Sequence, residues 1–428
     1  MPAKLSEFAS GLRVRPYDPA EVTTVRPDAE HPAAAAGMEP PDVEAIWEAT
    51  VDLYRTRLQP AIGLCVRRGG RVILDRTIGH ARGNGPLDPP DAPVQLATPD
   101  TLFNLFSASK AFTAMVIHML DERGYLHLDD PVAEYIPEFG RHGKDRITIR
   151  HVLTHRAGIP SVRGAEPDLD LMVDGTRVLE VICDVKPVWR PGRVLAYHAL
   201  TGGFILGEVV RRVTGRGIRE FLRETVLDPC AIENLDYGVT PEKLPRVAGN
   251  AFTGPRPKPP YNWLLQRALG VSMEAAAELS NDRRFLTAEI PAGNIIGTAD
   301  EACRFFQLLL NGGVLDGVRV LAPATLRRAV AEQSYLELDM TLLLPVRYGM
   351  GFMLGTDRFS LYGPRTPRAF GHLGFTYLIV YADPERDLSV AIMTTGKPFV
   401  TPSLWRVYQL LWTIAERCPR MVRSRSRG

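Results

Sequence analysis

The sequence predicts an α/β (α+β) fold, in which an antiparallel sheet built from both ends of the chain is flanked by helices and interrupted by an inserted, mainly helical domain. Two observations predict this architecture. Strand-like runs occur near both ends of the chain, first between residues 61 and 77 and again beyond residue 348. The residues between them carry mostly helical patterns. Packing such a helical insertion against a shared sheet buries the apolar faces of both.

The first and last parts of the chain are predicted to form the sheet domain, from residues 41–100 and 340–428. Gly69-Gly70 joins the first two strands as a β-hairpin. A last amphipathic helix covers Leu404 to Arg417. The predicted strands are Ala61 to Val66, Arg71 to Thr77, Tyr348 to Leu354, Phe375 to Tyr381 and Leu388 to Thr394.

Two further segments complete the predicted organisation. Residues 1–40 are rich in proline and alanine without periodicity, which predicts an extended or disordered N-terminal extension. Asp42 is then expected to cap a helix that runs to about Leu58. Residues 101–339 form the mainly helical domain, with an irregular, proline-rich loop from Gly254 to Pro260. The helix boundaries expected there are Thr148 and Gly158, Gly202 and Gly215, and Asp300 and Gly312.

The composition is that of an ordinary globular protein. The chain has 428 residues, 45% of them hydrophobic and 23% charged, and a net charge of +2. This charge gives no reason to expect a nucleic-acid partner. No apolar run approaches the roughly 18 residues of a membrane-spanning helix, so no integral membrane segment is expected. Nothing in the sequence fixes the oligomeric state.

The cysteines indicate reduced thiols. They are scattered and odd in number, which fits neither a disulfide framework nor a metal-binding C-x-x-C pattern. The stretch from Met1 to Glu7 lacks the apolar core of a signal peptide. We therefore predict a cytoplasmic protein. The five cysteines are Cys65, Cys183, Cys230, Cys303 and Cys418.

Ser107 and Lys110 form an S-x-x-K motif at the start of a long apolar helix pattern. Residues three apart lie on one helix face, so the amine is within reach of the hydroxyl. Burial and the positive end of the helix dipole both lower the lysine pKa from about 10.4 towards that of a usable base. Ser109 points elsewhere and is the weaker candidate. An isolated motif of this kind is often a cap with a solvated lysine, but a lysine that opens a buried helix needs a reason to be there.

Two more sites carry reactive side chains. Tyr197 stands just before a helix and is able to relay a proton if cations lower its pKa from about 10. In isolation, a core tyrosine with a satisfied hydroxyl is the favoured interpretation. His372 lies between Gly371 and Gly374 at the start of a predicted strand, where glycines permit close approach of a ligand to the backbone. In isolation, a surface histidine is the favoured interpretation.

Taken together in this order, the three sites resemble the serine β-lactamase and penicillin-binding-protein superfamily, in particular its class C-like branch with the family VIII carboxylesterases. The motifs are S-x-x-K at Ser107 and Lys110, the tyrosine at Tyr197, and H-x-G from His372 to Gly374. The resemblance runs from about residue 45 to residue 415. Residues 128–132, 147–155 and 311–317 also look like family sequence.

The resemblance implies an active site between an α/β domain and a helical domain. Ser107 would be the acylated nucleophile and Lys110 its base or proton carrier. Tyr197 would be the second base, serving the leaving group and then the deacylating water. His372 would line the opposite wall, where many relatives carry lysine. The oxyanion hole would use the backbone N–H groups of Ser107 and of Phe375, the residue after H-x-G.

Two departures from the family pattern bear on the substrate. The run Tyr197-His198-Ala199 lacks the asparagine that β-lactamases and peptidases often carry two residues after the tyrosine. The run His372-Leu373-Gly374 replaces their K-T-G and removes a cation that would hold a substrate carboxylate. We therefore predict a serine hydrolase that cleaves small carboxylic esters through an acyl-enzyme. The alternatives are an acyltransferase that uses the same acyl-enzyme, a β-lactamase or D-amino-acid peptidase, and a catalytically silent scaffold.

Other motifs give no further chemistry. His151 and His155 have the spacing of a zincin helix, but Val152 stands where the catalytic glutamate belongs, so both are interpreted as structural. The absence of a G-x-S-x-G elbow disfavours an α/β-hydrolase. No metal and no cofactor is predicted, and the expected partner is a small ester substrate. The basic tail from Arg420 to Arg427 is interpreted as a solvated terminus rather than a membrane contact.

Overall fold

A computed structural model describes residues 11–26, 28–161, 169–259, 262, 266, 270–399 and 403–421. Three parts of the sequence predictions lie outside these residues. They are the first ten residues of the N-terminal extension, Pro260 at the end of the predicted loop, and residues 422–427 of the basic tail.

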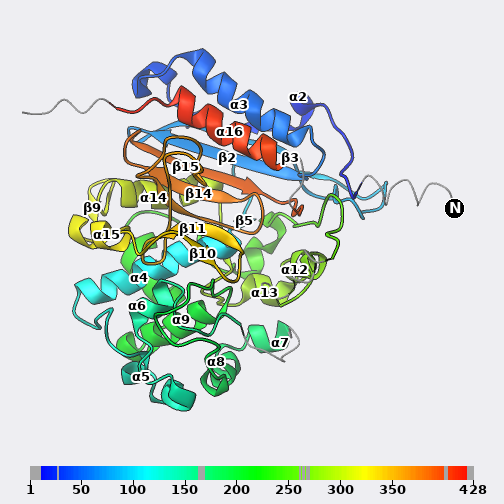
Figure 1. Ribbon diagram of the computed structural model, residues 1–428. Coiled ribbons are helices and arrows are strands. Elements are labelled where there is room, and N and C mark those ends of the chain that lie inside the picture. The colour runs from blue at the N-terminus through cyan, green and yellow to red at the C-terminus, as the bar shows by residue number, and fades with distance from the viewer. Residues whose placement is uncertain are drawn as a thin grey trace, which may run out of the picture.

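A ten-stranded sheet dominates the described part of the chain (Figure 1), with the order β1-β3-β2-β15-β14-β13-β12-β11-β10 and β4 paired to β3. All of its pairings are antiparallel. Strand β15 lies against β2, with Leu388 opposite Arg68 and Thr394 opposite Ile62. The prediction of an antiparallel sheet built from both ends is therefore confirmed. The strands are β1 (Thr23–Val25), β2 (Ala61–Arg68), β3 (Arg71–Arg82), β4 (Gln95–Leu96), β10 (Ser334–Asp339), β11 (Leu344–Tyr348), β12 (Met353–Leu354), β13 (Phe370–Leu373), β14 (Ile379–Asp383) and β15 (Leu388–Thr394).

Helices cover both faces of this sheet. On one face, α3 (Pro40–Tyr54) and α16 (Leu404–Arg417) lie side by side, the first and last long helices of the described chain (Figure 1). Their apolar sides share one core with residues of β2, β14 and β15. On the other face, α14 (Ala299–Leu310) packs against β2, β14 and β15. Each strand of the sheet centre is therefore buried on both sides, which explains why these strands read as continuous apolar runs.

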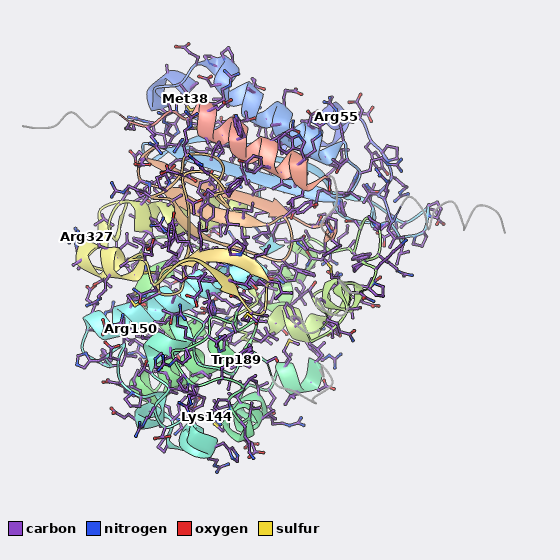
Figure 2. The ribbon with its side chains drawn as sticks, in the orientation of Figure 1. Met38, Arg55, Lys144, Arg150, Trp189 and Arg327 are labelled. Atoms are coloured by element: carbon purple, nitrogen blue, oxygen red, sulfur yellow. The ribbon has the colours of Figure 1, made fainter. Side chains whose placement is uncertain are left out.

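The helical region lies beyond α14, away from α3 and α16 (Figure 1). In Figure 2, Met38 and Arg55 mark the ends of α3, with Arg150 and Lys144 in the helical region on the opposite side of the sheet. The central helix α4 contacts α9, α10 and α15. The helices of this region are α4 (Ser109–Glu122), α5 (Val132–Tyr135), α6 (Ile149–Leu153), α7 (Leu169–Met172), α8 (Gly175–Asp184), α9 (Thr201–Thr214), α10 (Ile218–Leu222), α12 (Met273–Leu279), α13 (Arg283–Thr287) and α15 (Pro323–Ala329). A small sheet β5-β7-β6 accompanies them, made of Phe103–Asn104, Ile295–Gly297 and Asp236–Tyr237.

Some predicted helix boundaries are correct and others are wrong for local reasons. Thr148 caps α6, and Gly215 ends α9 in the left-handed conformation, as predicted. Asp42 is not the cap of α3: Glu39 is, and the Asp42 carboxylate accepts the Glu39 backbone N–H at 3.1 Å within a capping box. Thr298 rather than Asp300 caps α14.

Three predictions about extended segments need correction. The N-terminal extension is not without structure, because Thr23–Val25 pairs with β3. Tyr348 to Leu354 is two strands separated by a turn, in which the Gly349 N–H donates to the Phe352 carbonyl at 2.9 Å. His372 lies inside β13 instead of opening a strand, and residues 375–378 form the turn that follows. The hydrogen bond from the Gly374 N–H to the Leu378 carbonyl, 2.8 Å long, closes that turn.

The described residues contain no helix that is long and apolar enough to cross a membrane. The division into a sheet domain of residues 41–100 and 340–428 and a helical domain of 101–339 stays a prediction.

Candidate active site

Ser107 lies in a single 3₁₀ turn, η2 (Phe106–Ala108), directly ahead of α4. The turn begins with Phe106 at φ +48°, a left-handed conformation that is strained for a bulky residue. Ser109 holds this turn in place: its hydroxyl donates to the Phe106 carbonyl at 2.5 Å and accepts from the Ile295 backbone N–H at 2.9 Å. Ser109 is thus engaged in the scaffold.

Lys110, in the first turn of α4, is directed at this serine. Its Nζ lies 3.2 Å from Ser107 Oγ and donates to the Ala292 carbonyl at 3.0 Å. The side chain is almost entirely buried, and burial lowers its pKa to about 7. A large share of the amine is therefore neutral at physiological pH and carries a lone pair within hydrogen-bond distance of a hydroxyl.

Tyr197 lies beside the same two residues. Its ring centroid is 4.8 Å from Lys110 Nζ, and its hydroxyl is hydrogen-bonded to Ser107. Burial raises the tyrosine pKa, the bond to Ser107 lowers it, and Asp339 raises it, with a net shift upwards. From the sequence, the role of Tyr197 as a proton relay depended on cations that lower its pKa, but the pKa is raised instead. Tyr197 therefore carries its proton at neutral pH and acts as a phenol, not as a phenolate.

His372 faces Tyr197, with 6.2 Å between the ring centroids. Its Nδ1 lies 2.6 Å from the Leu373 carbonyl oxygen, so Nδ1 carries the proton and Nε2 has the free lone pair. Burial, and to a smaller extent the charge of Lys110, lowers its pKa to about 3. The imidazole is therefore neutral at physiological pH.

The segment after His372 docks against the turn that carries the serine. A Cβ at Gly374 would stand 2.6 Å from the Leu105 carbonyl oxygen, so a side chain there would push the two segments apart. The Phe375 ring lies 5.4 Å from the Phe106 ring, centroid to centroid. The backbones at Ser107 and Phe375, from which the two predicted oxyanion donors come, thus belong to neighbouring segments.

Sequence reasoning missed the roles of two residues that surround Tyr197. Asp339, at the end of β10, accepts the Tyr197 backbone N–H at 3.0 Å. His155 accepts the His198 backbone N–H on Nδ1 at 3.2 Å, and its ring centroid lies 4.8 Å from that of Tyr197. Asp339 gives no local signal, since it is 142 residues away in the chain. The spacing of His151 and His155 did draw attention to His155, but only as a candidate metal ligand of a zincin-type helix.

The two histidines with zincin-like spacing do not form a metal site in the described residues. His151 Nδ1 accepts the Thr148 backbone N–H at 3.2 Å and closes the cap of α6. In the part of the chain that the structure describes, no three histidine, cysteine, aspartate or glutamate side chains are grouped to hold a metal ion.

A second buried lysine supports the turn from behind. Lys397 Nζ lies 4.7 Å from the Phe106 ring centroid and donates to the Thr394 carbonyl at 2.6 Å. Burial lowers its pKa to about 7. Nothing in its G-K-P context indicated a buried position.

This fold, with a buried lysine and a tyrosine against one serine, is that of a serine hydrolase. The beta-lactamase family matches residues 50–410. The chain is 30% identical to Esterase/beta-lactamase LipL of Mycobacterium tuberculosis over 381 residues. The alignment covers 83% of this chain and 82% of LipL. The chain belongs to the beta-lactamase family.

Two solved structures are also similar. A penicillin-binding-protein homologue from Caulobacter crescentus superimposes with a TM-score of 0.75 at 28% identity, covering 89% of this chain and 99% of that protein. A family VIII carboxylesterase superimposes with a TM-score of 0.74 at 26% identity, covering 90% and 99%. The predicted resemblance to this superfamily, including its esterase branch, is confirmed.

Proposed function

We propose that this protein hydrolyses small, largely uncharged carboxylic esters through an acyl-enzyme on Ser107. The observation that carries the proposal is the buried Lys110 amine, 3.2 Å from Ser107 Oγ and with a pKa of about 7. One relative is named an esterase/beta-lactamase and one similar structure is a family VIII carboxylesterase, and both names support ester hydrolysis.

In the first step, Ser107 Oγ attacks the ester carbonyl carbon while the neutral Lys110 amine accepts the hydroxyl proton. The negative charge that develops on the carbonyl oxygen is stabilised by the backbone N–H groups of Ser107 and Phe375. When the tetrahedral intermediate collapses, the ester C–O bond breaks. The leaving alkoxide takes its proton from the Tyr197 hydroxyl, which is replenished by the Lys110 ammonium.

The second step releases the acyl group as a carboxylic acid. Water attacks the acyl carbon, and its proton passes to Tyr197 and Lys110 as the bond to Ser107 Oγ breaks and the serine is reprotonated. Because Tyr197 keeps its proton in the resting enzyme, it transfers protons in concert with Lys110. Both residues therefore belong to one proton circuit.

The substrate class follows from the wall opposite the serine. His372 is neutral at physiological pH, so it offers a substrate carboxylate no fixed charge. The Phe375 ring packs against Phe106, and the Tyr197 ring faces His372. An apolar wall with a neutral hydrogen-bonding group favours uncharged esters over anionic β-lactams.

The test of this proposal compares the kcat/KM of p-nitrophenyl acetate and butyrate with that of a chromogenic cephalosporin. We expect efficient ester turnover and little or no cephalosporin cleavage. Product analysis with an added alcohol then separates hydrolysis from acyl transfer, because a transferase would form the new ester in preference to the free acid. Efficient cephalosporin cleavage with little ester turnover would overturn the proposal.

The pH dependence of kcat/KM is a second expected result. The protonated Lys110 is inactive and the neutral form active, so the rate should rise with pH and level off above about pH 7. His198 and His372, with pKa values of about 3, remain neutral over this range. The measurement is initial rates on an uncharged ester from pH 5 to 9. A profile that is flat across this range would contradict the role of Lys110 as the base.

The five cysteines bear on the location. All of them are free and buried. This state supports a cytoplasmic location, which we include in the proposal.

A further inference from the structure

Lys110 lines a small cavity of about 30 Å³. This cavity is partly open and lies between α4, the end of α6 and the start of α9. All of its lining residues except Gly351 are buried. They are Lys110, Thr113, Ala114, Val152, Leu153, His155, His198, Gly202, Gly203, Leu206 and Gly351.

His198 is the unusual member of this lining. The residue is fully buried. The Ala196 backbone carbonyl is near enough to raise the pKa of His198, but within the described part of the chain neither Nδ1 nor Nε2 makes a hydrogen bond of normal geometry. A buried polar ring without partners costs free energy, because the hydrogen bonds it makes with water in the unfolded chain are lost. A neutral imidazole has one donor and one acceptor nitrogen, and the nitrogen that does not face the Ala196 carbonyl is available here.

The hydrogen bonds of Lys110 leave one direction open. A neutral amine has two N–H groups and one lone pair. The lone pair must face the Ser107 hydroxyl for proton transfer, and the Ala292 carbonyl accepts one N–H at 3.0 Å. The second N–H is left for the cavity, because Lys110 is itself part of the lining.

We propose that this cavity holds ordered water that joins Lys110 to His198, and that His198 is thereby a positioning residue for the lone pair of the base. This inference rests on the proposed function, in which Lys110 takes the proton of Ser107. The volume accommodates one or two water molecules, and the site offers each of them polar partners. The water accepts or donates at Lys110 and satisfies His198 at the same time.

The groups around Lys110 make this link selective. His155 uses Nδ1 as an acceptor for the His198 backbone N–H, and His372 uses Nδ1–H as a donor to Leu373. All three histidines have lowered pKa values, for which burial is the largest cause. The Tyr197 ring covers Lys110 Nζ, which lies 4.8 Å from the ring centroid. His198 is thus the one of these histidines whose ring makes no hydrogen bond of normal geometry in the described residues.

A substitution at Gly202 displaces the water without replacing either polar side chain. A Cβ at this position would lie 3.4 Å from Val152 Cγ1 and 3.5 Å from His198 Cβ, which is ordinary van der Waals contact within the cavity wall. Gly202→Ala should therefore fold. Gly175→Ala at the start of α8, where a Cβ meets nothing within 4 Å, is the matched control for the helix-propensity effect.

The experiment measures the Lys110 pKa directly by ¹⁵N NMR of the lysine amines, assigned with Lys110→Met, together with the pH profile of ester kcat/KM. Loss of the water removes a partner of the ammonium, so Gly202→Ala and His198→Leu should both lower the Lys110 pKa. Each should also reduce kcat/KM on its alkaline plateau by about tenfold, the value of one hydrogen bond. Gly175→Ala should match the wild type in both measurements.

The variants also test whether the two residues act through one water. The double variant Gly202→Ala with His198→Leu should be no worse than either single variant, because both remove the same link. His198→Gln, which keeps an acceptor and a donor, should restore most of the plateau rate lost in His198→Leu. An unchanged Lys110 pKa in both Gly202→Ala and His198→Leu would overturn the inference. If the pKa shifts occur but the wild type turns over no ester, the water link stands and the proposed function fails.

Discussion

Replacement of Ser107 by alanine is expected to abolish ester turnover, with kcat falling by at least about 10⁴-fold. The variant removes the atom that forms the acyl-enzyme, and Lys110 and Tyr197 then have no nucleophile to activate. Its fold should persist, because only one oxygen is lost from a half-buried side chain. The measurements are steady-state rates, the thermal midpoint, and labelling by a fluorophosphonate probe, which should mark Ser107 in the wild type and nothing in the variant.

Ser109→Ala is the matched control, since it removes the same atom two residues away. This hydroxyl holds the turn through Phe106 and Ile295, so its loss should lower the free energy of unfolding by about 1–3 kcal/mol. Most of the ester activity should remain below the lowered thermal midpoint. An inactive Ser109→Ala beside an active, probe-labelled Ser107→Ala would contradict the assignment of the nucleophile.

The parts of the fold that were predictable from sequence are those with strong local periodicity. Leu404–Arg417 was predicted with the boundaries that α16 has, because its apolar residues recur at helical spacing. Strands β2 and β15 were recognisable for a different reason, because each is a short, largely apolar run of residues. The S-x-x-K motif was informative because one helical turn links its two residues, so their proximity needs no tertiary structure.

What the sequence did not predict depends on contacts between distant residues. Thr23–Val25 pairs with β3, but a strand of three residues is too short for its periodicity to be detected in the sequence. The end of β13 at Leu373 is set by the tight turn that docks Gly374 against Leu105, a contact across more than 260 residues. His198 was noted only as a departure from a family motif, and its place beside the cavity follows from the packing of three helices.

Replacement of Lys110 by methionine is expected to separate activity from stability. Proton handling typically supplies about 10²–10⁴-fold in rate, and Lys110→Met should lose a factor in this range or greater. Tyr197→Phe should lose a comparable factor. The double variant should be little worse than either single variant, because both residues serve one proton circuit. Losses that multiply in the double variant would contradict a shared circuit.

The same Lys110→Met variant should be more stable than the wild type. Burial holds the Lys110 pKa at about 7 in the folded protein, against about 10.4 in the unfolded chain. The unfolded state therefore binds more protons between these two values, and the cost of burying the amine is full below pH 7 and disappears as the pH approaches 10.4. Methionine fills a similar volume without that cost. The unfolding free energy of Lys110→Met should therefore exceed that of the wild type by on the order of a few kcal/mol below pH 7, and this gain should shrink as the pH rises.

Lys397 provides the matched comparison, because its pKa is similarly lowered and it is distant from Lys110 in the sequence. Lys397→Met should show the same pH-dependent gain in stability while keeping most ester turnover. Denaturant unfolding at pH 6, 8 and 10 measures both variants, and a Lys110→Met variant that is less stable than the wild type at pH 6 would contradict the buried-amine assignment.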